Sequence, residues 1–127
     1  MTYRDDIKSA VLGDHGVAAV VGAQVYWLRA PLKAQAPYII LQIVTEEQSG
    51  TLAGNVRQAE IRLMVSMYGE SYTDLQALDA AVHVALGDGN SPQPPFTSLR
   101  LFHTELFEDD TRLFHLVTEF SIFHPNP

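Results

Sequence analysis

Hydrophobic and polar residues alternate along two long stretches between Pro37 and Tyr68. In each stretch every second residue is apolar, which is the period of a β-strand with one buried face. The apolar positions are Ile39, Leu41 and Ile43 in the first stretch, and Ala59, Ile61, Leu63, Val65 and Met67 in the second. The pattern predicts a β-hairpin with one strongly apolar face.

A polar segment from Glu46 to Asn55 connects the two predicted strands. It includes Gly50 and Gly54, and it is much longer than the roughly 2–5 residues that close an ordinary hairpin. Because reversing the chain does not require such a length, we expect the segment to have a role beyond turning the chain.

Shorter elements are predicted on both sides of this hairpin. Asp5 and Asp6 favour a helix start near the N-terminus, since the helix dipole stabilises acidic residues in the first turn. We expect a helix over residues 3–12, one or two further helical turns at 17–21, a strand at 24–28, a loop at 29–36, a helix at 71–86, and strands at 98–108 and 112–124.

The helix that follows the hairpin has clear boundary signals. Ser71 and Asp74 have the spacing of a capping box, which satisfies free backbone N–H groups in the first turn. Gly87 follows its end, where glycine commonly stops a helix. The apolar residues at helical spacing are Leu75, Leu78, Val82 and Leu86. We expect this stripe to pack against the apolar face of the hairpin.

The last two strands are expected to form a second hairpin. A three-residue turn at 109–111 would place Leu106 opposite Phe114 and gather the apolar residues on one face. A two-residue turn would mix Glu105 with Phe114 instead. The pattern therefore favours the three-residue register.

The order of these elements predicts an α+β fold. We expect a mostly antiparallel sheet of four to five strands, with two helices packed on one face. A chain of 127 residues is expected to form a single domain over residues 1–127.

Composition and charge exclude several classes of function. The chain has no cysteine, which excludes disulfides, iron–sulfur clusters and thiolate zinc sites. Its net charge of −7 opposes tight binding to a phosphate backbone, so we expect no sequence-specific nucleic-acid binding.

The sequence also argues against a membrane or secreted protein. Asp5 and Asp6 lie where a signal peptide would need a basic flank, and the apolar run at 16–23 is far shorter than the roughly 20 residues that span a bilayer. We expect a soluble protein made in the cytoplasm and no membrane partner.

Titratable residues offer one candidate for catalysis. In the three-residue register, His103, Glu105 and His115 share one face of the second hairpin, where they could hold a divalent metal or act as an acid/base pair. A metal-dependent hydrolase is therefore one alternative, and a small cytoplasmic ligand-binding domain is another. A solvated polar face explains the same residues more simply, and we expect no cofactor and no enzyme.

The other face of the long hairpin is mixed in character. Tyr38, Ile40, Val44, Met64 and Tyr68 alternate there with polar residues such as Arg62. Aromatic residues and arginine are enriched in protein interfaces. This face is either an interface or a surface that another part of the same chain covers.

Several short motifs, taken in order, resemble a known family. They are residues 18–22 (AAVVG), Val25-Tyr26, 36–42 (APYIILQ), the long strand 57–68, Ser71-Tyr72 and 107–114 (FEDDTRLF). Together they resemble the small tail-completion proteins of long-tailed bacteriophages, over nearly the whole chain.

The resemblance implies a structural protein of the virion that is present in the host cytoplasm before assembly. Members form a ring, typically a hexamer, at the head-proximal end of the tail tube, where it meets the major tail tube protein and the head connector. They are often monomeric before assembly and have no catalytic residues. The contact residues expected here are Glu46, Glu47, Gln48, Ser49, Gly50, Thr51, Leu52, Gly54 and Asn55 in the loop, with Tyr38, Arg62 and Met64 on the mixed face.

Overall fold

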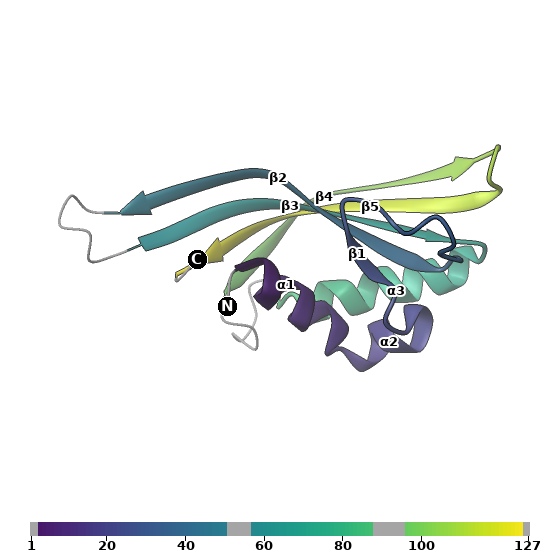
Figure 1. Cartoon of the computed structure of the whole chain (residues 1–127), viewed down its shortest axis with the longest axis horizontal. Coiled ribbons are helices and arrows are strands. Elements are labelled where there is room, and N and C mark those ends of the chain that lie inside the picture. The colour runs from purple at the N-terminus through teal and green to yellow at the C-terminus, as the bar shows by residue number, and fades with distance from the viewer. Residues whose placement is uncertain (1–2, 51–56, 88–95, 126–127) are drawn as a thin grey trace.

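The computed structural model describes residues 3–50, 57–87 and 96–125. Within these ranges, five strands form one sheet in the order β1-β2-β3-β5-β4, and three helices lie on one of its faces (Figure 1). The helices are α1 (Tyr3–Leu12), α2 (His15–Val21) and α3 (Tyr72–Ala85); the strands are β1 (Val25–Trp27), β2 (Tyr38–Gly50), β3 (Arg57–Gly69), β4 (Thr97–Glu108) and β5 (Leu113–His124). The β1–β2 pair is parallel and the other three pairs are antiparallel, which confirms the predicted α+β class.

The central hairpin of β2 and β3 provides the floor of the core. Its predicted apolar face is confirmed, because the alternating residues from Ile39 to Leu41 and from Ala59 to Met67 are buried against the helices. A β-bulge between Ile43 and Thr45 then shifts the register of β2 by one residue. A bulge reverses which face the following side chains occupy.

The long connection predicted at 46–55 is wrong in its first half. Residues Glu46 to Gly50 continue β2 and pair with β3, so this part of the hairpin is strand and extends beyond the helices (Figure 1). Its alternation of apolar and polar residues is lost because Glu46 meets Tyr3, at the start of α1, through a hydrogen bond and not through an apolar contact. The sequence therefore resembles a loop. Residues 51–56 lie outside the described part of the chain.

Helix α3 is capped and packed as predicted. Ser71 Oγ accepts a hydrogen bond from the Asp74 backbone N–H at 3.3 Å, and Gly87 follows the helix with a positive φ of 87°. Its buried residues are Leu75, Leu78 and Val82. They join the side chains of β3 and β5 in one hydrophobic core.

Helix α2 begins at His15, two residues before the one or two helical turns predicted at 17–21, and it makes the number of packed helices three instead of two. Asp14 caps it, with Oδ1 accepting from the Val17 backbone N–H at 3.1 Å. Gly16 brings α2 close to α3, since a Cβ at this position would lie 2.9 Å from the Cβ of Ala81. None of the helices in the described ranges is long and apolar enough to span a bilayer.

The second hairpin forms, and from Phe102 to Glu108 its register differs by one residue from the predicted one. A β-bulge between Arg100 and Phe102 then returns residues 97–100 to the predicted register. The turn has four residues, 109–112, and Glu108 pairs with Leu113. Arg112 adopts a left-handed φ of 62° and donates its backbone N–H to the Glu108 carbonyl at 2.9 Å. Since a one-residue slip exchanges the two faces of a strand, β4 presents different residues to the core than the sequence predicted.

Candidate interaction surface

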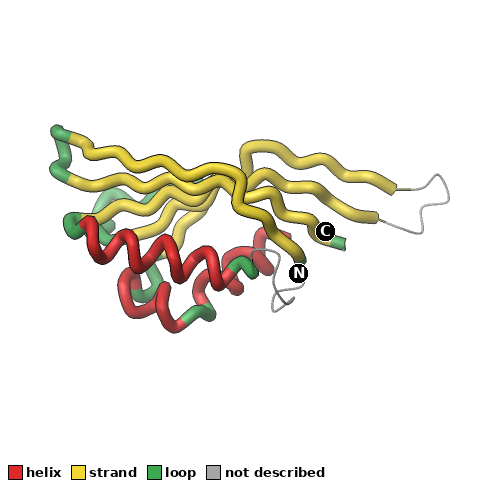
Figure 2. Tube along the Cα trace, turned by 180° about the vertical axis from the view of Figure 1, so that it is seen from behind, coloured by secondary structure: helices red, strands yellow, loops and turns green. Residues whose placement is uncertain are grey.

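The face of the sheet opposite the helices is open in the part of the chain that the structure describes. All three helices lie on the other face (Figures 1 and 2). The sequence left undecided whether another part of the chain covers the mixed face of the long hairpin. No helix does so among the described residues, and this face is therefore available to a partner.

An aromatic row crosses four strands of the open face. The rings of Tyr26 and Tyr38 lie 6.5 Å apart, those of Tyr38 and Tyr68 are stacked at 5.1 Å, and those of Tyr68 and His115 are stacked at 4.1 Å. Tyr38 of β2, Tyr68 of β3 and His115 of β5 are direct partners in neighbouring strands, whereas Tyr26 of β1 pairs with Ile40 and is therefore displaced from Tyr38 by two residues along the sheet. Burial raises the pKa of both Tyr38 and Tyr68, so their phenols stay neutral and able to donate a hydrogen bond.

His115 ends this row in a partly desolvated position. Its Nε2 atom is buried without a hydrogen-bond partner, and burial lowers the pKa of the imidazole. The folded protein therefore binds this proton less readily than the unfolded chain does. As a result, the neutral His115 side chain contributes to the free energy of unfolding at neutral pH, and this contribution is lost as the pH falls below about 6.5, the pKa of histidine in the unfolded chain.

Replacing His115 with phenylalanine tests this dependence. We expect His115→Phe to keep the stacking on Tyr68 and to show a smaller loss of Tm between pH 7.5 and pH 5.5 than the unmodified protein. Thermal unfolding at the two pH values, followed by circular dichroism, measures the loss. His15→Gln, at an exposed position of α2, is the matched control and should leave it unchanged. An equal loss in His115→Phe would contradict the assignment.

Arg62 and Met64 continue the open face towards the projecting end of the hairpin. Arg62 Nε forms an ion pair with Glu119 Oε1 at 3.3 Å, and Met64 lies between Gln42 and Glu119 on the neighbouring strands. A shallow hollow beside them is lined by Thr45, Glu47, Glu60, Arg62 and Ser121. Glu47 lies directly opposite Glu60, a like-charge pair that is unfavourable unless a cation is near.

Glu46 lies on the other side of the strand, facing α1. Tyr3 donates its hydroxyl to the Glu46 carboxylate, and Gln48 Nε2 donates to Glu46 Oε2 at 2.9 Å. The bond from Tyr3 lowers the pKa of Glu46, while burial, followed by that bond, raises the pKa of Tyr3 to about 12. Glu46 therefore connects the hairpin to the helical layer within this chain.

The predicted contact residues thus divide into three groups. Tyr38, Glu47, Arg62 and Met64 belong to the open face, and Glu46 and Gln48 belong to the helix side of the hairpin. Ser49 and Gly50 lie in strand β2. Thr51, Leu52, Gly54 and Asn55 lie outside the described residues.

Strand β4 adds an apolar row that the sequence did not predict. Its large hydrophobic residues are exposed, with Phe102 at 50% and Leu106 at 52%. The full set along this edge is Leu99, Leu101, Phe102, Leu106 and Phe107. The predicted register placed Leu106 and Phe102 on the core face, and only knowledge of the four-residue turn would have revealed the exposed row.

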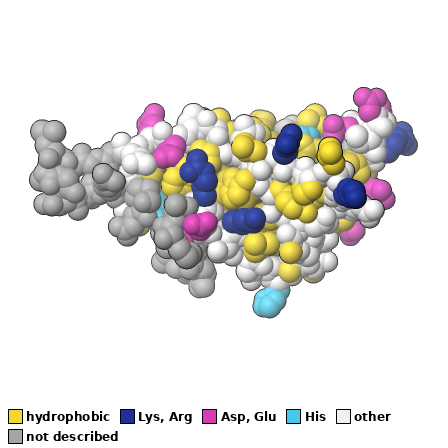
Figure 3. Space-filling model, viewed as in Figure 1, with side chains coloured by type: hydrophobic (Ala, Val, Ile, Leu, Met, Phe, Trp, Pro, Cys, Tyr) yellow, Lys and Arg dark blue, Asp and Glu magenta, His cyan; other side chains and the backbone are white. Residues whose placement is uncertain are grey.

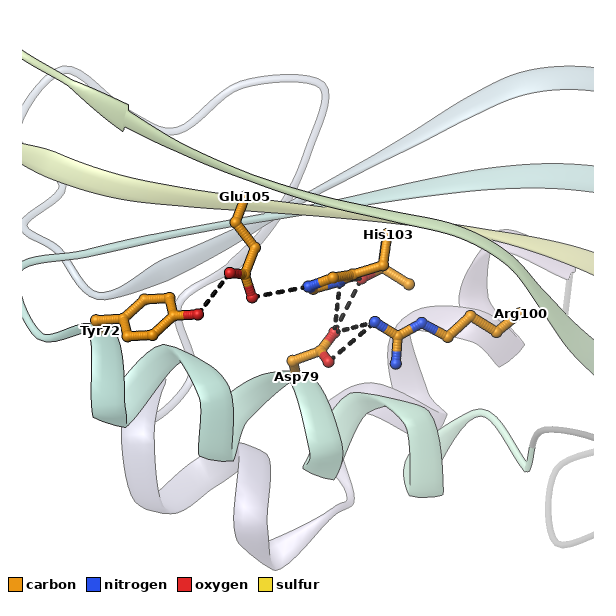
Figure 4. Close-up of polar contacts among 6 residues, drawn as sticks. Tyr72, Asp79, Arg100, His103 and Glu105 are labelled. Atoms are coloured by element: carbon orange, nitrogen blue, oxygen red, sulfur yellow. Dashed lines mark hydrogen bonds and ion pairs between the residues drawn. The ribbon is translucent and has the colours of Figure 1, made fainter.

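The inner side of β4 carries polar residues that bond to α3 (Figure 4). Arg100 Nη2 forms an ion pair with Asp79 Oδ2 at 3.1 Å, and Thr118 Oγ1 donates to Asp79 Oδ1 at 2.9 Å. His103 contacts Thr118 Oγ1 at 2.9 Å through Nδ1, and Glu105 Oε2 at 3.0 Å through Nε2. Tyr72 donates to Glu105, whose pKa is lowered first by the His103 contact and then by this bond.

The proposed grouping of His103, Glu105 and His115 is wrong. Leu106, and not Glu105, pairs with His115, so His115 stacks on the open face while His103 and Glu105 face α3. Within the described ranges, no group of three or more histidine, aspartate or glutamate residues has the arrangement of a metal site. The space beneath the sheet, where the alternative of a ligand-binding domain would place its ligand, is filled by buried side chains of α1, α2 and α3.

Comparisons with known proteins agree with this picture. The family model described as tail completion protein gp17 matches residues 5–124. A chain in the structure titled "Virion of native gene transfer agent (GTA) particle" has the same fold, with a TM-score of 0.67 and 17% identity; the match covers 92% of this chain and 90% of that one. No curated protein sequence matches. The resemblance found in the sequence is confirmed: the chain belongs to the tail completion protein gp17 family, whose members are structural proteins of the phage tail.

Proposed function

We propose that this protein completes the tail by forming a ring of identical copies at the head-proximal end of the tail tube, where the ring joins the tail to the head connector. The observation that carries the proposal is the open face of the five-stranded sheet. A soluble monomer rarely exposes a large apolar patch, and such patches mark sites of association. Here the described helices all lie on the opposite face, so they do not cover the aromatic row of the open face or the exposed hydrophobic side chains of β4.

The composition of the open face supports contact with protein. Its aromatic row, with Arg62 and Met64 beside it, has the residue types that dominate binding energy in protein interfaces. We place Tyr38, Glu47, Arg62 and Met64 in this contact surface.

The projecting end of the β2–β3 hairpin supplies a second contact region. The described end of β2 and the start of β3 extend past the helices, beyond the body of the subunit (Figure 1). A projecting element can contact a neighbouring copy or the tail tube protein without rearrangement of the core. We therefore propose that the chain is a monomer before assembly and that the hairpin docks only in the particle.

Charge supports a role around DNA without binding to it. The net charge of −7 repels the phosphate backbone, so DNA passing through a ring of such subunits does not adhere to it. We propose that the protein acts by assembly alone and catalyses no reaction.

Complementation of a phage or prophage that lacks the gene tests the proposal. We expect lysates without the gene to contain unattached heads and uncapped or overlong tails by negative-stain microscopy. Met64→Asp, which places an uncompensated charge on the open face, should fail to restore attached particles. Val84→Asp is the control, because Val84 is 72% exposed on α3, away from the open face, and this variant should complement. Normal virions in the absence of the gene would overturn the proposal.

A further inference from the structure

The two edges of the sheet lie on opposite sides of the molecule. Strand β1 is in the foreground of Figure 1 and strand β4 in the foreground of Figure 2, which views the molecule from behind. The edges are also level with each other along the strands. Tyr26 of β1 is joined through Ile40, Ser66 and Val117 to Thr104 of β4 by successive strand pairings.

The β4 edge combines exposed apolar side chains with acidic residues. Leu99, Phe102 and Leu106 are each at least half exposed. Asp109 and Asp110 are exposed in the adjoining turn, and Glu108 precedes them. The charge of Arg100 on the same strand is neutralised by Asp79 within the subunit. The acidic edge, defined as Leu99 to Asp110, therefore offers hydrophobic contact beside negative charge.

The β1 edge combines exposed apolar side chains with basic residues. Leu28 is 72% exposed and Leu32 is fully exposed, and Arg29 and Lys33 beside them are exposed as well. Leu28 adopts a left-handed φ of 68° at the centre of a tight turn that ends β1, where the Arg29 backbone N–H donates to the Trp27 carbonyl at 2.8 Å. No acidic residue occurs between Asp14 and Glu46. The basic edge is defined as Leu28 to Lys33.

The surface of the molecule reflects this distribution. On the face that carries β1, hydrophobic and Lys or Arg side chains occupy the middle, while Asp and Glu side chains lie towards the ends (Figure 3). A protein with a net charge of −7 carries here a surface strip without acidic residues. Such a strip matches an acidic partner, and the β4 edge of a second copy is one.

We propose that the acidic edge of one copy docks on the basic edge of the next, and that this contact builds the ring. The inference rests on the ring proposed above and names its interface. Contact between two acidic edges, or between two basic edges, would oppose like charges, so a symmetric dimer is disfavoured. In the head-to-tail contact, the exposed leucines of the basic edge pack against the exposed leucines and Phe102 of the acidic edge. The opposite charges of the two edges determine which edge each one binds.

The strand directions are compatible with this contact. Along the sheet, β2 and β3, β3 and β5, and β5 and β4 are each antiparallel, so β4 runs opposite to β1 and β2. A second copy placed beside the first without being turned over therefore brings its β1 edge antiparallel to β4. The contact leaves the open face of every copy on the same side of the assembly.

Charge reversal on each edge tests the contact. Arg29→Glu with Lys33→Glu makes the basic edge acidic, and Asp109→Lys with Asp110→Lys makes the acidic edge basic. In the complementation assay, each pair is expected to reduce capped tails at least tenfold. The four substitutions in one chain should restore capping, because the charges are then exchanged but still complementary. Co-expression of the two double variants should also restore capping. One variant has two acidic edges and the other has two basic edges, so a ring in which they alternate places unlike charges opposite each other at every contact.

The controls separate this inference from the proposed function. Ala77→Glu with Ala80→Glu adds negative charge at exposed positions of α3, away from both edges, and should cap tails normally. Far-ultraviolet circular dichroism verifies that each variant folds, and the milder pair Arg29→Ala with Lys33→Ala replaces any variant that does not. Normal capping by both charge-reversal pairs would overturn the edge contact while leaving the ring intact. Loss of capping without rescue by the four-fold variant would also overturn it.

Discussion

Replacing Leu78 with alanine is expected to lower the free energy of unfolding by about 2–5 kcal/mol, because it leaves a cavity in a close-packed core. Leu78 is fully buried and belongs to the cluster that joins α3 to the sheet. The measurement is chemical denaturation with urea, with the midpoint and slope compared between variants.

Val84→Ala is the matched control on the same helix. Val84 is 72% exposed, so removing its methyl groups should change stability by less than about 0.5 kcal/mol. A similar loss in both variants would mean that α3 does not pack on the sheet through the side that contains Leu78.

Asp79→Ala is expected to be the second most destabilising change, by about 2–3 kcal/mol. The Asp79 carboxylate accepts a hydrogen bond from Thr118 and pairs with Arg100, and its side chain is only 15% exposed (Figure 4). Its removal takes away both the ion pair with the partly buried Arg100 and the hydrogen bond from Thr118. Urea denaturation measures the loss.

Asp79→Asn separates charge from hydrogen bonding. The amide oxygen can still accept the hydrogen bond from Thr118, so we expect a smaller loss than with alanine, and one that salt affects less than it affects the unmodified protein. Equal stability of Asp79→Ala and the unmodified protein would show that the contacts between α3 and β4 contribute little.

The long hairpin could be predicted because its burial is periodic. Ile39, Leu41 and every second residue from Ala59 to Met67 are buried in the core beneath the sheet, and one buried face imposes a period of two on the sequence. The α3 stripe and its serine cap were predictable for the same reason, since each is a local pattern with one structural meaning.

The continuation of β2 to Gly50 could not be predicted in the same way. Beyond the bulge at Ile43 and Thr45 the strand reaches the end of the helical layer, where Glu46 contacts Tyr3 of α1 through a hydrogen bond, so its own side chains there are polar. Backbone pairing with β3 maintains the strand there. A polar strand without a buried face has the composition of a loop.

The faces of β4 could not be predicted because they depend on the length of one turn and on a β-bulge between Arg100 and Phe102. The sequence of residues 109–112 fits a three-residue or a four-residue turn, and the left-handed conformation of Arg112 selects the longer one. The aromatic and basic contact residues of the open face could be predicted from the sequence. Two features could not be predicted. The exposed row of β4 depends on the turn at 109–112, and which of Glu46 and Glu47 lies on the open face depends on the bulge in β2.

Strand β4 has polar residues on its core-facing side and apolar residues on its outward side, and this arrangement has an evolutionary consequence. Its core-facing side holds the subunit together through Arg100 and His103, whereas Leu99, Phe102 and Leu106 on the outward side contribute little to folding. Substitutions can therefore accumulate at the outward positions without loss of a folded subunit. A lineage can change the neighbour that its subunit accepts while it keeps the same scaffold.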